Sequence, residues 1–218
     1  MTNPAEQSRR FQLSSRPPRQ PLARGRAVLV GAAAGALMVL SVTAASATST
    51  SLPPGGNVPA SPTTAATEPD LAGTVIRDTL VSFTIKTAGG KVLCTGRLQD
   101  RVVRSTKTGR FHFYYRIRNT KGPGAINRID TTSFAGHPLE VGYRTDGLGT
   151  VPPRVAMRSG APGEVVTFEL PDPPISCARH QESRFILIKT DADAFHTGGK
   201  TRIVATSGAQ VTVPTVMP

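Results

Sequence analysis

The chain has 218 residues, with 26 lysines and arginines against 14 acidic residues, a formal net charge of +12, two cysteines and no tryptophan. A basic balance of this kind suits nucleic acid or an anionic surface, but after residue 47 the cations stand singly in strand-like segments, so we expect no nucleic-acid partner. The sequence lacks the patterns G-x-S-x-G, H-E-x-x-H, the P-loop and paired C-x-x-C. It therefore carries none of these common signatures of serine hydrolases, zinc peptidases, nucleotide-binding proteins and zinc or redox sites.

Residues 1–47 have the layout of a secretory signal peptide. Arginines at positions 9, 10, 16, 19, 24 and 26 precede an uncharged apolar run over residues 27–40, and small residues end in Ala45-Ser46-Ala47. This order predicts cleavage after Ala47 and a secreted or extracytoplasmic protein. The apolar run is shorter than the roughly 20 residues of a membrane span, so we expect membrane contact only if the segment is retained. Residues 8–13 resemble the twin-arginine export signal, and the Sec route is the alternative.

Residues 48–69 are rich in serine, threonine, alanine, glycine and proline, and carry no charge before Glu68. A segment of this composition buries too little apolar area to offset the entropy of ordering it. We therefore predict a flexible linker, followed by one domain over residues 70–218.

Short segments of alternating polar and apolar residues fill this domain. In chain order, residues 81–85 alternate, Gly89-Gly90 predicts a turn, residues 92–98 form the partner strand with a bulge at Gly96, and residues 111–118 are the clearest strand. Further strands are predicted at residues 126–134, 139–143, 154–158, 165–170, 184–189, 201–205 and 210–213. Frequent glycine and proline between them exclude helices of normal length. The fold class is therefore all-β, either a barrel or, as we prefer, an antiparallel β-sandwich of immunoglobulin-like or jelly-roll-like type.

Cys94 and Cys177 are the only cysteines, and both lie in the predicted domain. In an oxidising compartment, such a pair without metal-type spacing predicts a disulfide, here between strands of different sheets. The alternative is a catalytic thiol at Cys177 activated by His180.

The strand at residues 111–118 places His112, Tyr114, Arg116 and Arg118 on one face. Arginine supplies bidentate donors and tyrosine a stacking plane, so this row is a candidate binding site for a phosphate or a sugar. The alternative interpretation is an ordinary solvated sheet face.

A second candidate binding site is formed by Tyr143, Arg144 and Asp146, where a strand meets a turn. Asp146, Gly147 and Gly149 suit a tight turn with positive φ. The polar side chains either brace this turn or line a ligand groove.

Asp191 and Asp193 offer two carboxylates at alternate positions of a predicted loop. Calcium takes several oxygen ligands of this kind, so it is the one cofactor that the sequence suggests. The run lacks the glycine and the closing glutamate of an EF-hand, and a solvated turn is the alternative.

Three motifs, at residues 113–119, 141–150 and 183–190, together resemble a group of exported bacterial proteins, some of which carry a C-terminal PEP-CTERM surface-sorting tail. The resemblance implies an exported β-sandwich and assigns no role to single residues. Residues 206–218 contain neither the apolar helix nor the arginine cluster of such a tail.

These observations predict an exported, non-catalytic module with a binding or structural role at the cell envelope or outside the cell, whose partner is an anionic envelope polymer or an extracellular protein. One alternative is a secreted hydrolase of unfamiliar geometry, for which His137, Asp146 and Arg144 are the residues to test; with Ser159 they include a His, Asp, Ser order. Another is a secreted inhibitor that presents the proline-rich loop at residues 170–175.

Overall fold

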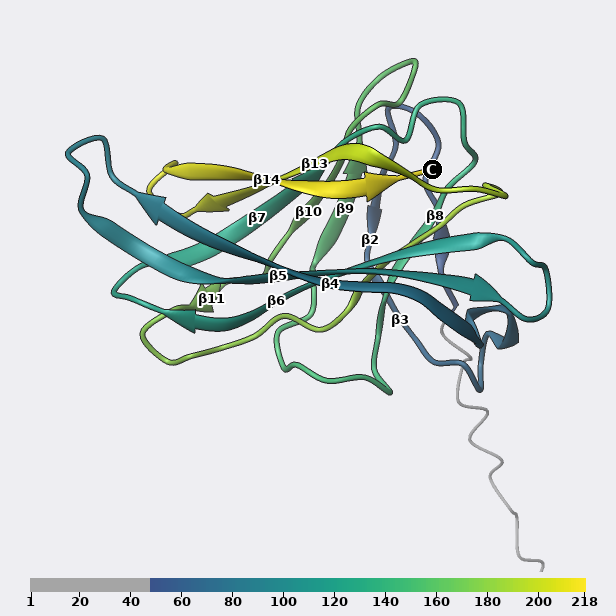
Figure 1. The fold of residues 1–218 in the computed structure, drawn as a ribbon, viewed down its shortest axis with the longest axis horizontal. Helices are drawn as coiled ribbons and strands as arrows, with labels where there is room; N and C mark the ends of the chain where they lie inside the picture. The colour runs from purple at the N-terminus through teal and green to yellow at the C-terminus, as the bar shows by residue number, and fades with distance from the viewer. Residues whose placement is uncertain (1–47) are drawn as a thin grey trace, which may run out of the picture. The chain divides into compact units, whose positions relative to one another are not determined.

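Two sheets of seven strands each lie face to face in residues 48–218, the part of the chain that the computed structural model describes (Figure 1). The first, sheet A, has the order β1-β8-β12-β6-β5-β4, with β3 alongside β8. Its strands are β1 (Thr50–Ser51), β3 (Ser61–Thr63), β4 (Gly73–Lys86), β5 (Val92–Ser105), β6 (Phe111–Lys121), β8 (Glu140–Arg144) and β12 (Ile186–Lys189).

The second, sheet B, has the order β14-β13-β7-β10-β9-β2, with β11 beside β7. Its strands are β2 (Asn57–Pro59), β7 (Ala125–Thr131), β9 (Val155–Arg158), β10 (Val166–Glu169), β11 (Ile175–Ser176), β13 (His196–Ala205) and β14 (Gln210–Met217). All strand pairs are antiparallel except β3 with β8. One short 3₁₀ turn, η1 (Pro69–Leu71), completes the elements of the described chain. The predicted all-β antiparallel sandwich is confirmed.

The β4–β5 hairpin is longer than the sequence pattern indicates. β4 begins at Gly73 instead of residue 81, and β5 continues to Ser105. The additional length of β5 was missed because the adjacent residues Gln99 and Asp100 are both polar and both buried, which breaks the alternation expected of a strand.

The apolar core lies between the sheets. It forms because alternate residues of each strand point inward, and these residues are mostly apolar. On β6, Phe113, Tyr115 and Ile117 point inward and are fully buried. Phe113 packs edge-to-face on Phe134, with ring centroids 5.6 Å apart. Phe168 on β10 is also fully buried and belongs to the same cluster. Aromatic rings in this arrangement compensate for the missing tryptophan by filling the space between the sheets.

The prediction of a flexible linker over residues 48–69 is wrong. β1 pairs with β8, β2 pairs with β9, and β3 pairs with β8, so this segment extends the edges of both sheets. Pro59 and Pro62 are tolerated because an edge strand needs backbone donors on one side only. A composition that is typical of a linker is therefore also compatible with short edge strands. The domain starts well before residue 70.

Arg158 anchors the N-terminal segment, residues 48–69, to the sandwich. Its side chain is buried and donates to the carbonyl oxygens of Leu52 at 3.2 Å, Phe134 at 2.7 Å and Gly163 at 2.9 Å. Burial lowers the pKa of Arg158. The guanidinium thus connects the N-terminal segment to two loops of the sandwich through charge-assisted hydrogen bonds.

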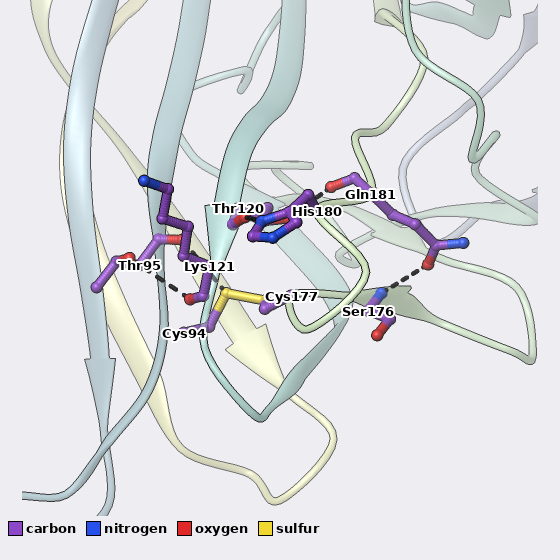
Figure 2. Close-up of a disulfide and its surroundings, with 8 residues drawn as sticks. All are labelled: Cys94, Thr95, Thr120, Lys121, Ser176, Cys177, His180 and Gln181. Carbon is purple, nitrogen blue, oxygen red and sulfur yellow. Dashed lines mark hydrogen bonds between the residues drawn. A yellow bond between two sulfur atoms is a disulfide. The ribbon is translucent and has the colours of Figure 1, made fainter.

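Cys94 and Cys177 form the predicted disulfide, with Cα atoms 5.8 Å apart (Figure 2). Cys94 lies on β5 of sheet A and Cys177 directly follows β11 of sheet B, so the bond links the two sheets. The predicted bulge near Gly96 is also confirmed, since the β5–β6 register shifts between Thr95 and Arg97. A Cβ on Gly96 would lie 2.7 Å from the ring of Phe83, which explains the glycine.

The predicted signal peptide, residues 1–47, lies outside the described residues. Within residues 48–218, no helix has the length and apolar character needed to cross a bilayer.

Candidate functional site: the outer face of sheet A

The outer face of sheet A carries the row predicted on β6. His112, Tyr114 and Arg116 point away from the core, as predicted, but they are only 2%, 3% and 4% exposed. The interpretation of this row as a solvated face is therefore wrong. A second, smaller apolar cluster covers part of it, in which Leu71 from η1 and Phe185 before β12 pack against Tyr114.

Five residues form what we call the arginine–aromatic cluster: Arg101, Tyr114, Arg116, Arg144 and Phe185. The rings of Tyr114 and Phe185 meet edge-to-face, with centroids 6.3 Å apart. The guanidinium carbon of Arg101 lies 4.6 Å from the Phe185 centroid, and that of Arg116 lies 5.5 Å from it. Arg144 lies 6.0 Å from the Tyr114 centroid. Cation–π contacts thus hold three arginines over two rings.

Each arginine of the cluster also has one carboxylate partner. Arg101 bonds Asp78 at 2.6 Å, and Arg116 bonds Glu182. The Arg116 Nε and Nη1 atoms and the Arg101 Nε atom are buried without a hydrogen-bond acceptor. The aromatic faces beside these groups partly compensate for that, because N–H groups interact weakly with π systems.

Arg144 holds Asp146 through two parallel hydrogen bonds, from Nε at 2.7 Å and from Nη2 at 2.6 Å. Hydrogen bonds from Arg144 lower the pKa of Asp146. Asp146 in turn accepts a hydrogen bond from the backbone N–H of Ala65 at 3.0 Å, and Arg144 donates to the carbonyl of Leu71 at 3.4 Å. The pair therefore braces the turn after β8 and fastens the N-terminal segment, as the bracing interpretation predicts.

A hollow of about 170 Å³ opens at the cluster, lined by Arg101, Val103, Tyr114, Arg144, Asp146, Gly147 and Phe185. The structure thus brings together three of the predicted binding residues from distant parts of the chain: Tyr114, Arg144 and Asp146. Arg116 adjoins them through Phe185. Tyr143 does not join them, since alternation on β8 turns it to the opposite side from Arg144.

His112 lies opposite Lys189 on the neighbouring strand, beside a group that we call the lysine cluster: Lys189, Glu68, Asp70 and Glu140. Lys189 Nζ bonds Glu68, and lies 2.9 Å from Asp70 and 2.7 Å from Glu140. Although burial opposes it, hydrogen bonds from Lys189, Ser49 and Thr63 lower the pKa of Glu68 to about 2. Burial lowers the pKa of His112. The lysine cluster fastens η1 to sheet A, and the sequence prediction missed it because Glu68 lay in the presumed linker.

Asp191 and Asp193, the two carboxylates proposed to bind calcium, have different surroundings. Asp191 accepts a hydrogen bond from, or donates one to, His137 Nδ1 at 2.7 Å, while Asp193 is exposed. Among residues 48–218 no group of three histidine, cysteine or acidic side chains is arranged to hold a metal ion. Calcium binding stays a prediction without support from this geometry.

The alternative of a catalytic thiol is wrong, because Cys177 is consumed by the disulfide. His180 is turned away to the backbone, with Nδ1 2.8 Å from the carbonyl oxygen of Thr120 (Figure 2). The backbone carbonyl oxygen of the next residue, Gln181, accepts a hydrogen bond from the hydroxyl of Thr120. These bonds make the surroundings of the disulfide structural.

The residues of the His, Asp, Ser order also have separate partners. His137 bonds Asp191, Asp146 bonds Arg144, and Ser159 Oγ accepts from the backbone N–H of Val165. His137 precedes β8 and Asp146 follows it, so the two lie beyond opposite ends of that strand. The geometry does not form a triad.

The proline-rich loop at residues 170–175 borders a hollow of about 660 Å³ beside sheet B, which also includes Arg128, Arg154 and Glu169. Leu170 is buried and its backbone N–H donates to Asn127. The part of the loop nearest β10 is therefore fastened to the sheet.

Comparison with known proteins gives no further assignment: no protein family, curated protein or solved structure matches this chain. The resemblance to exported bacterial proteins stays a prediction. The site is thus defined by its own geometry, as a small surface hollow with fixed guanidinium groups, paired carboxylates and two largely buried aromatic rings.

Proposed function

We propose that the chain is an exported, non-catalytic binding module that holds an acidic polymer of the cell envelope or of the surrounding medium at the arginine–aromatic cluster. The single observation that supports this function is the convergence of Arg101, Arg116 and Arg144 on the rings of Tyr114 and Phe185 beside a surface hollow. Planar guanidinium groups bind carboxylates and phosphates through paired hydrogen bonds.

The cluster is fixed before any ligand arrives. Tyr114 and Phe185 belong to a buried apolar group, and Arg144 is tied to Asp146 and to the backbone of Leu71. Fixing these side chains in advance reduces the entropy lost on binding. Export is supported by the basic, apolar and small-residue order of residues 1–47, and by a disulfide of the kind that persists in oxidising compartments.

The test is titration of the purified protein with polygalacturonate, an acidic polysaccharide, by isothermal calorimetry. Arg101→Gln is the informative variant, because Arg101 is partly exposed and its loss removes one charged donor pair from the hollow. We expect this variant to weaken binding by about tenfold.

Arg154→Gln is the matched control. Arg154 has the same kind of single carboxylate partner, Glu169 at 2.8 Å, but lies on the side of sheet B. We expect it to bind as the unaltered protein does. Equal weakening by both variants, or failure of polygalacturonate and of every other acidic polymer tested to bind the unaltered protein, would overturn the proposed function.

A further inference from the structure

The arginines of the outer face continue beyond the cluster along β5 and β6. The two strands pair so that Arg101 lies opposite Tyr114, Gln99 opposite Arg116, and Arg97 opposite Arg118. Arg97 and Arg101 are four residues apart on one strand, a separation of about 13 Å. We call the line formed by Arg97, Arg101, Arg116 and Arg118 the arginine track.

The track holds more positive charge than its own carboxylates neutralise. Asp78 and Glu182 pair with Arg101 and Arg116, whereas within the described chain Arg97 has no ion-pair partner and is exposed. Like charges directly opposite each other on neighbouring strands are destabilising, and this is the arrangement of Arg97 and Arg118.

The titration of Arg116 reflects this excess. Burial lowers the pKa of Arg116, Glu182 raises it, and the charges of Arg118 and Arg101 lower it again. An anion laid along the track would relieve this repulsion, so the folded surface is electrostatically prepared for one.

A hollow lies at each end of the track. One is the hollow of about 170 Å³ at Arg101 and Tyr114. The other, of about 620 Å³, includes Arg97, Thr95 and Asn119. Glu182 lines the second hollow and forms an ion pair with Arg116. Arg116 in turn lies over the ring of Phe185, which lines the first hollow. One ion pair therefore connects the two hollows.

The second hollow is lined by groups suited to sugar hydroxyls. Besides Arg97 and Lys121 it presents the neutral polar residues Ser82, Thr84, Thr95 and Asn119. Hydroxyl and amide groups both donate and accept hydrogen bonds. The carboxylates of Asp78 and Glu182 beside the track disfavour a polymer with a dense negative charge, such as polyphosphate, but can accept hydrogen bonds from hydroxyls.

We propose that the ligand is a linear, carboxylated polysaccharide that lies along β5 and β6 and fills both hollows. This inference rests on the proposed function. It specifies the class of polymer and the direction in which the polymer lies on sheet A. Carboxylates of the polymer pair with Arg97 and Arg101, whose side chains reach the surface, while the buried Arg116 adds its charge from beneath. The hydroxyls of the polymer bind in the hollow at Arg97.

Oligogalacturonates of increasing length test the proposal by calorimetry, from the single sugar acid to oligomers long enough to reach from Arg101 to Arg97. We expect the affinity to rise with length until both ends of the track are occupied. Arg97→Gln should weaken the long oligomers by about tenfold and leave the shortest unchanged, whereas Arg101→Gln should weaken both. Arg97 is exposed and has no ion-pair partner, and its loss removes the repulsion from Arg118, so the variant should melt at the temperature of the unaltered protein or slightly above it.

Each other outcome has a distinct meaning. Affinity that does not depend on length, with no effect of Arg97→Gln, overturns the track but leaves the proposed function in place. Binding of polyphosphate in preference to oligogalacturonates overturns the polymer class alone. Failure of every acidic polymer to bind overturns both the proposed function and this inference.

Discussion

Replacing Asp100 by asparagine should flatten the pH dependence of stability. Asp100 is only 1% exposed, lies on β5 and accepts a hydrogen bond from the backbone N–H of Val216 on β14 at 3.1 Å, so it joins the two sheets. Burial raises the pKa of this carboxyl to about 6, although Val216 and Arg77 act in the opposite direction. The charged form is therefore disfavoured in the folded protein.

The sign and size of the effect follow from this pKa. Between the unfolded value of 3.8 and the folded value of about 6, the folded protein binds more protons than the unfolded chain, so the free energy of unfolding falls as pH rises. A difference of about two pKa units corresponds to about 3 kcal/mol. We expect the free energy of unfolding of Asp100→Asn, relative to the unaltered protein, to increase by about 3 kcal/mol from about pH 4 to about pH 8.

The assay is urea unfolding across this pH range, followed by circular dichroism. Asp78→Asn is the control, because hydrogen bonds from Arg101 and Gln99 lower the pKa of Asp78 despite its partial burial. Its stability relative to the unaltered protein should fall as pH rises through the acid range up to about pH 4, opposite in sign to Asp100→Asn, and should change little from about pH 4 to about pH 8. Parallel stability curves for Asp100→Asn and the unaltered protein would show that the Asp100 carboxyl keeps an ordinary pKa in the folded protein, contrary to this prediction.

Three further substitutions probe the sandwich. Replacing Cys94 and Cys177 together by alanine should lower the free energy of unfolding by about 4 kcal/mol, because the disulfide closes a long loop; an unchanged urea midpoint would contradict this. Arg158→Met should cost about 3 kcal/mol, since backbone carbonyls lose their donors, and should expose residues 48–63 to proteolysis, whereas a protected segment would count against the anchoring role. Gly149→Ala should cost more than about 2 kcal/mol in thermal unfolding, because φ is 95° and the added Cβ would lie 1.9 Å from the carbonyl oxygen of Ser183; a neutral result would be inconsistent with the described turn.

Much of the sandwich could be predicted from the sequence, because its central strands expose one face to the core and the other to a different environment. Phe113 and Tyr115 alternate with polar neighbours, and this period is sufficient to identify β6. Cys94 and Cys177 could be paired because there was only one pairing to make.

Edge strands could not be predicted in the same way. β1, β2 and β3 are held by a few backbone hydrogen bonds and by single side chains such as Leu52, so their composition carries no period. Their position depends on Arg158 and Lys189, which lie more than a hundred residues later in the chain. A local pattern contains no information about partners at that distance.

The candidate site was predicted in fragments. Tyr114 and Arg116 were predicted in one candidate site and Arg144 and Asp146 in another, but Phe185, which joins the two, looked like an ordinary strand residue. Burial of the row on β6 was not foreseen, because a covering layer from η1 leaves no trace in the alternation of β6 itself.

The most direct measurement of the central claim is nuclear magnetic resonance of the arginine Nε–Hε groups during titration with oligogalacturonate. We expect the signals of Arg97 and Arg101 on sheet A to shift with the ligand, while those of Arg154, which directly precedes β9 of sheet B, and of Arg202 on β13 stay in place. Shifts confined to Arg154 and Arg202, or no shift at any arginine, would contradict a binding face on the outside of sheet A.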